Sequence, residues 1–162
     1  MISSLTPPDG PGSGLGFGGI TPSVAIEFDT YYNTEVGDAN GNHIGIDLNG
    51  SLRSVIQKQI SKRFNDGDLW HCWVDYDGVN NILEVRVAPT FARPSDPTIS
   101  LHESIPRMFS PMYMGFSAAT GAEYSSHYIV EWDFSLTPRK DCHGMQQKKV
   151  KKERKERRNQ SF

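Results

Sequence analysis

The stretch "VAIEFDTYYNTEVGDANGNHIGID", residues 24–47, decides the fold class and the candidate site of this chain. Its first part alternates apolar and polar residues, which is typical of a half-buried β-strand. That period of two places Glu27, Asp29 and Tyr31 on the same side of the strand. Two carboxylates on one strand face repel each other unless a cation or a shared proton lies between them. The stretch therefore predicts a strand that carries a charged binding site.

Other alternating segments predict that the whole body is built from strands. "NHIGIDLNG" gives a short strand that ends in a turn, and residues 68–89 give a β-hairpin that turns at "DGVNN". Residues 112–120 and 127–136 are predicted as two more strands. The segment 51–64 fits a helical spacing, but its surroundings favour a strand. Short strands with Gly/Asn turns predict an all-β, antiparallel sandwich or barrel.

Charge divides this chain of 162 residues into an acidic body and a basic tail. Residues 148–162 carry eight Lys or Arg and two Glu, a net charge of +6, so the other 147 residues carry −8. An acidic body argues against nucleic acid as the main partner and is compatible with binding cations. No apolar run approaches the roughly 18 residues of a membrane span, and the first ten residues lack the features of a signal peptide.

The acidic segment offers the side chains of a metal site. Asn33, Asp38 and His43 follow Glu27 at +6, +11 and +16. Carboxylate and amide oxygens are the hard ligands that Ca²⁺ prefers, and one imidazole added to carboxylates suits a transition ion such as Mn²⁺. The number of acids exceeds what one ion needs, so we expect two adjacent ions that share Asp29 and Asp38.

Four other interpretations of this segment were weighed. A solvated acidic loop is one. An EF-hand fails because its sixth position from Asp38 is His43 rather than Gly, and its twelfth is Asn49 rather than Glu. A jelly-roll glycoside hydrolase would use Glu27 and Asp29 as its acid and its nucleophile or base, about 5–10 Å apart. The fourth is a structural fragment that binds no ligand.

Three ordered motifs resemble a known family, the L-type or legume-like lectins. "SVAIEFDTYYN…D…NHIGID" is similar to the family's metal-binding strand and loop, and "WVDYDG…NILEVRVAP" is similar to its next hairpin. "MYMGFSAATGAEYSSHYIVEWDFSL" resembles its last strands and the sugar-specificity loop between them. The resemblance implies an antiparallel jelly-roll sandwich of the concanavalin A-like type. We expect a partial lectin domain over residues 1–141 and a basic, disordered tail over 142–162.

The resemblance also implies binding residues and excludes catalysis. The transition ion, Mn²⁺ or a similar metal, would be held by Glu27, Asp29, Asp38 and His43. Calcium would be held by Asp29, the Tyr31 carbonyl, Asn33 and Asp38. Carbohydrate of the mannose/glucose or galactose type would contact Ser13, Tyr31, Asn33, Ala122 and Glu123. An ordinary core position is the alternative for Tyr31, and a plain hairpin tip for Ala122 and Glu123.

Several departures from the family shape the expectations. Family domains have strands before the Gly-rich segment at residues 10–19, and these carry an Asp that accepts hydrogen bonds from the sugar. By this resemblance we expect the chain to start inside that domain and to bind monosaccharide more weakly. We also expect uncovered sheet edges that favour homo-oligomers. The family implies a secreted or extracellular-facing protein.

Overall fold

The computed structural model describes residues 2–3, 12–103, 113–121 and 124–136. The chain divides into two compact units, Met1–His127 and Tyr128–Phe162. The described elements are β1 (Ile2–Ser3), the 3-10 helix η1 (Gly12–Gly14), β2 (Ser23–Asp29), β3 (His43–Leu48), β4 (Ile56–Gln59), β5 (His71–Asp77), β6 (Ile82–Ala88), β7 (Ile99–His102) and β8 (Tyr113–Met114). Every strand pairing is antiparallel, which confirms the predicted all-β class.

The first sheet has the strand order β4-β3-β2-β1-β8 and carries the acidic segment. Its β2–β3 pair places Asp29 opposite His43 and Glu27 opposite Gly45. Residues opposite each other in a ladder share a face of the sheet. The register therefore brings two acids and a histidine that lies 14 or more residues after them in sequence to one face.

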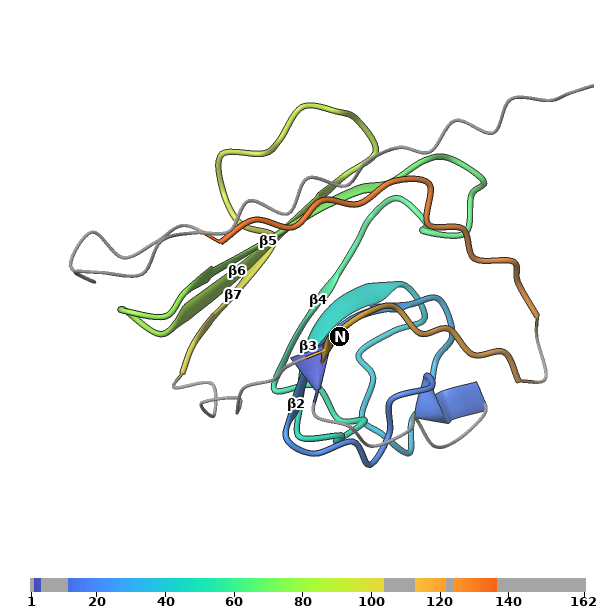
Figure 1. Ribbon diagram of the computed structural model, residues 1–162. Helices are drawn as coiled ribbons and strands as arrows, with labels where there is room; N and C mark the ends of the chain where they lie inside the picture. Colours follow the sequence, from blue (N-terminus) through green and yellow to red (C-terminus); the bar gives the residue numbers. More distant parts are fainter. Residues whose placement is uncertain (1, 4–11, 104–112, 122–123, 137–162) are drawn as a thin grey trace, which may run out of the picture. The chain divides into compact units, whose positions relative to one another are not determined.

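The second sheet has the order β5-β6-β7 and confirms the predicted hairpin over residues 68–89. Its inner face packs against the first sheet (Figure 1). The shared core consists of Val24, Ile44, Ile46, Leu83, Val85, Ile99 and Leu101, each at most 7% exposed. The apolar residues of β2 and β3 thus bury one face, and the other face is left for the acids.

Within the ambiguous segment 51–64, residues Ile56–Gln59 form the strand β4, and the rest forms turns and loops. β4 pairs with β3, and Ile56 lies opposite Ile46. A helix would have satisfied its own backbone groups but would have left the edge of β3 unpaired. Tertiary pairing therefore decides the conformation here.

Three expectations about strands are wrong. Of the predicted strand 112–120 the structure describes residues 113–120, and among these only Tyr113–Met114 form a strand. Residues 127–136 form no strand. Alternation specifies the two faces of a strand, but a strand needs a neighbour for its backbone hydrogen bonds. Likewise, Tyr31 lies beyond the end of β2 rather than within it.

Candidate metal centre

Two neighbouring strands and one loop build a cluster of buried polar side chains. Glu27 and Asp29 come from β2, and His43 is the first residue of β3. The three are 5%, 7% and 0% exposed, and one ligand atom from each lies within 4.8 Å of the others. Buried ionisable groups are expensive unless they are paired or bind a metal.

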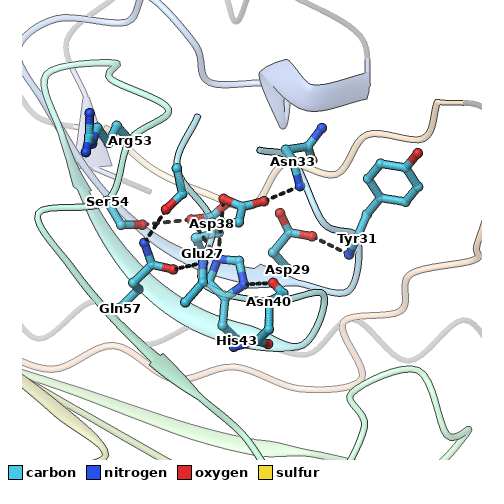
Figure 2. Close-up of polar contacts among 12 residues, drawn as sticks. Glu27, Asp29, Tyr31, Asn33, Asp38, Asn40, His43, Arg53, Ser54 and Gln57 are labelled. Atoms are coloured by element: carbon cyan, nitrogen blue, oxygen red, sulfur yellow. Dashed lines mark hydrogen bonds and ion pairs between the residues drawn. The ribbon is translucent and has the colours of Figure 1, made fainter. Parts of the chain in front are cut away.

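The loop after β2 returns Asp38 to this cluster (Figure 2). The backbone N–H of Asn33 donates to Asp38 Oδ2 at 2.7 Å, and the N–H of Asp38 donates to the Asn33 carbonyl at 3.3 Å. The other carboxylate oxygen, Oδ1, lies 3.8 Å from His43 Nε2, which is also 3.9 Å from Glu27 Oε2. These separations are too long for hydrogen bonds.

The ring of His43 has a defined orientation. Its Nδ1 lies 2.8 Å from the Asn40 carbonyl oxygen, which can only accept, so Nδ1 carries the hydrogen. In the neutral ring, Nε2 then carries no hydrogen and has a free lone pair. This buried atom has no hydrogen-bond partner, and it faces the carboxylates of Glu27 and Asp38. A hydrogen bond from one ring nitrogen to a backbone carbonyl, with a free lone pair on the other nitrogen, is the arrangement of a metal-binding histidine.

Burial, and then the charge of neighbouring acids, disfavours the ionised form of these carboxylates. Burial raises the pKa of Glu27 to about 8, and the charge of Asp47 adds to the shift. Burial also raises the pKa of Asp47 to about 6 and raises that of Asp38. Without a cation the cluster therefore holds protons that ordinary carboxylates release.

Two members of this site were missed from the sequence, Asp47 and Ser54. Asp47 is 0% exposed, and neither of its carboxylate oxygens has a hydrogen-bond partner. The sequence could have indicated Asp47, because alternation along β3 places it on the same face as His43. Ser54 donates from Oγ to Glu27 Oε2 at 2.9 Å. It lies outside the strands, so no periodicity could have found it.

Because Gly45 has no side chain, it leaves room for the side chains of Ser54 and Glu27. A Cβ added to this glycine would lie 2.2 Å from Ser54 Oγ and 2.9 Å from Glu27 Oε2. Any side chain here would push at least one of these groups away from the other. A glycine on this face of β3 is thus a requirement of the site.

The spacing of the donor atoms fits metal ions. With metal–ligand bonds of roughly 2.1–2.5 Å, two ligand atoms of one octahedral ion lie about 3–5 Å apart. The distances of 3.8 and 3.9 Å from Nε2, and the 4.8 Å limit of the group, lie within that interval. Oxygen donors with one imidazole nitrogen suit a transition ion beside a hard cation.

The residues predicted to contact carbohydrate are only partly covered by the structure. Tyr31 is 52% exposed, so the alternative of a core aromatic is wrong, and its N–H donates to Asp29 Oδ1 at 2.6 Å. Asn33 donates from Nδ2 to Glu35 Oε1 at 3.0 Å. Ala122 and Glu123 lie outside the described residues.

The Gly-rich segment lies beside the stretch that precedes Ala122. Ser13 is exposed in η1, and the neighbouring Gly12 approaches Gly121. Ser117 Oγ donates to the Leu15 carbonyl at 2.8 Å. Segments 102 residues apart in sequence therefore lie side by side.

Comparisons with known proteins agree with this fold. A family model for the legume lectin domain matches residues 7–151. The chain is 38% identical over 125 residues to the L-type lectin-domain containing receptor kinase IV.2 of Arabidopsis thaliana, covering 69% of this chain and 18% of the kinase. It is 36% identical over 126 residues to the receptor kinase SIT2 of Oryza sativa subsp. japonica, covering 69% of this chain and 18% of that protein.

A solved structure extends the likeness to three dimensions. A lectin from Bauhinia forficata in complex with GalNAc superposes with a TM-score of 0.51 and 28% identity, over 74% of this chain and 62% of that chain. The likeness confirms the jelly-roll sandwich of legume-lectin type. Fold and site thus define a lectin, a class of carbohydrate-binding protein.

The chain belongs to the legume lectin domain family. It spans at most about one fifth of the length of the receptor kinases it matches. The family is a binding family rather than an enzymatic one, and the glycoside hydrolase alternative has no support. No helix among the described residues is long and apolar enough to cross a membrane.

Proposed function

We propose that this domain binds carbohydrate through a loop that a pair of metal ions holds in place. The observation that carries the proposal is the convergence of buried carboxylates on the unpartnered Nε2 of His43. Glu27, Asp29, Asp38 and His43 would hold Mn²⁺ or a similar transition ion. Asp29, the Tyr31 carbonyl, Asn33 and Asp38 would hold Ca²⁺.

The ions would supply charge and rigidity rather than chemistry on the sugar. A sugar is a neutral ring of hydroxyl groups, so it is bound by fixed donors and acceptors together with an apolar surface. Fixing a loop costs conformational entropy at the moment of binding. A loop that the ions have already ordered spares the ligand this cost, and the segment from Asp29 to Asp38 is that loop.

The proposed sugar site combines an exposed ring with polar groups. The half-exposed Tyr31 would stack on the C–H face of the sugar, and the Asn33 amide would donate to a hydroxyl. Ser13, Ala122 and Glu123 would complete the site from the Gly-rich segment and the specificity loop. The close approach of Gly12 to Gly121 supports this, because it brings the two segments together.

Galactose-type ligands deserve testing beside mannose and glucose. The Bauhinia forficata lectin was solved with GalNAc, a galactose derivative. We propose no catalytic activity for this domain, and we propose that the sheet edges allow homo-oligomers. By analogy with the receptor kinases it resembles, we propose that it faces the extracellular side.

The test is sugar binding with and without metal. Calorimetric titration with mannose, glucose, galactose and GalNAc, together with a glycan array, would use protein loaded with Ca²⁺ and Mn²⁺ or stripped by a chelator. We expect binding by the loaded protein and none by the stripped protein. The variant Asp38→Asn should lose metal and sugar together, and the exposed Asp96→Asn is the matched control. Equal binding in chelator, or no metal uptake, would overturn the proposal.

A further inference from the structure

The side chain of Gln57, on β4, forms hydrogen bonds with the loop backbone on both sides of Asp38. We call this pair of hydrogen bonds the Gln57 clamp. The backbone N–H of Ala39 donates to Gln57 Oε1 at 2.8 Å. Gln57 Nε2 donates to the Gly37 carbonyl at 3.0 Å. The amide group thus bonds the residue before and the residue after Asp38 (Figure 2).

This pair of bonds uses what is special to a primary amide. Such a side chain has a donor and an acceptor in one plane, as a backbone peptide group does. A carboxylate has no donor and an ammonium has no acceptor, so neither can make both bonds. Residues 37–39 therefore pair with β4 through a side chain, although they belong to no strand.

Of the four residues proposed to hold the transition ion, Asp38 is the one that lies outside the strands. Glu27, Asp29 and His43 lie in β2 and β3, where the ladder fixes their backbone. Asp38 lies in a loop, next to Gly37, whose φ of +89° marks a tight turn. Its carboxylate still lies 3.8 Å from His43 Nε2.

We propose that Gln57 is a positioning residue for metal binding: it fixes the loop so that Asp38 faces the centre before an ion arrives. This inference rests on the proposed function, because it assumes that Asp38 is a ligand. Gln57 acts through Asp38 and contacts no sugar. The free energy of metal binding then does not have to include the ordering of residues 37–39.

The experiment compares three variants of the full chain. Gln57→Leu keeps the size of the side chain and removes both bonds. Gln57→Glu keeps the acceptor for Ala39 and loses the donor to Gly37. Gln59→Leu is the matched control, because Gln59 is exposed two positions further along the same face of β4.

Two readouts are measured: Ca²⁺ and Mn²⁺ affinity by calorimetry, and amide hydrogen exchange of Ala39 in the metal-free protein. We expect Gln57→Leu to weaken metal binding roughly 10-fold, in the range for outer-shell partners. It should also speed exchange at Ala39, while its melting temperature without metal matches that of Gln59→Leu. Gln57→Glu should keep Ala39 protected and still weaken metal binding.

The outcomes separate this inference from the proposed function. If the wild type takes up metal and Gln57→Leu binds it as tightly as Gln59→Leu does, the inference is wrong and the proposed function stands. If the wild type takes up no metal, the proposed function is wrong. If amide exchange at Ala39 is unchanged in Gln57→Leu, the Gln57 hydrogen bonds do not hold the loop, and the inference is wrong regardless of the measured metal affinity.

Discussion

His43 donates from Nδ1 to the carbonyl oxygen of Asn40 at 2.8 Å, and this bond leaves Nε2 facing the carboxylates. The bond comes from the loop just before β3, so the backbone that positions the histidine also selects its tautomer. Nε2 is the buried nitrogen of the cluster, and it has no hydrogen-bond partner. It is therefore the atom on which metal selectivity should depend.

The first prediction concerns the imidazole. His43→Gln replaces the nitrogen ligand with a neutral amide of similar size. We expect transition-ion affinity to fall by more than the roughly 10–100-fold that outer-shell partners cost, and Ca²⁺ affinity to fall less. Competition titration with both ions measures this. His102→Gln, an exposed histidine on β7, is the control. An equal loss for both ions would show that His43 only supports the fold.

The second prediction concerns pH. The pKa of Glu27 is about 8 in the folded protein against an ordinary value of 4.5, so between these values the folded state keeps a proton that the unfolded chain has released. The free energy of unfolding of the metal-free protein should therefore fall as the pH rises from about 5 to 8, at up to about 1.4 kcal/mol per pH unit for one proton.

Metal should reverse this trend, because ions bind the ionised carboxylates and affinity rises with pH. Urea unfolding at pH 5 and pH 8, with chelator and with Ca²⁺ plus Mn²⁺, measures both effects. Stability of the metal-free protein that rises with pH would contradict the assignment of a raised pKa to Glu27.

The sequence predicts those parts of this molecule that depend on local pattern. Alternation places Glu27 and Asp29 on one face of β2, and the β-hairpin is specified by its own turn. Gly45 and Ser54 show where this reasoning ends. Their contact depends on how β3 and the segment before β4 pack, and no spacing in the sequence specifies that distance.

The segment 127–136 shows a second limit of prediction from the sequence: a strand-like pattern without a strand. Its alternation is as regular as that of β2, but none of its residues lies in a strand. Pattern indicates that a segment is able to form a strand, and pairing decides whether it does. Asp47 is an intermediate case. Alternation on β3 predicts the face on which it lies, but it does not predict that the side chain is buried.

The third prediction concerns this buried acid. Asp47→Asn removes a negative charge beside Glu27, whose pKa should fall toward its ordinary value. We expect the stability of the metal-free protein to depend less on pH between about 6 and 8 than in the wild type. Asp68→Asn, at an exposed site, should leave that dependence unchanged. An identical pH profile for Asp47→Asn would show that Asp47 does not influence Glu27.

The last prediction concerns the glycine on which the centre depends. In Gly45→Ala the new methyl group would lie 2.2 Å from Ser54 Oγ and 2.9 Å from Glu27 Oε2, so one of these groups must move. We expect a loss of about 1–3 kcal/mol in the free energy of unfolding, as for other overpacked sites, together with weaker metal binding.

Two further variants test whether the contact with Ser54 is the cause. Gly115→Ala is the control, because a Cβ there would meet no atom within 4 Å. Adding Ser54→Ala to Gly45→Ala removes the atom nearest the new methyl group and should recover part of the stability. It should not recover full metal affinity, because the hydrogen bond that orients Glu27 is then absent. If Gly45→Ala binds Ca²⁺ and Mn²⁺ as the wild type does, Glu27 does not need its present position to hold an ion, and the centre is built differently.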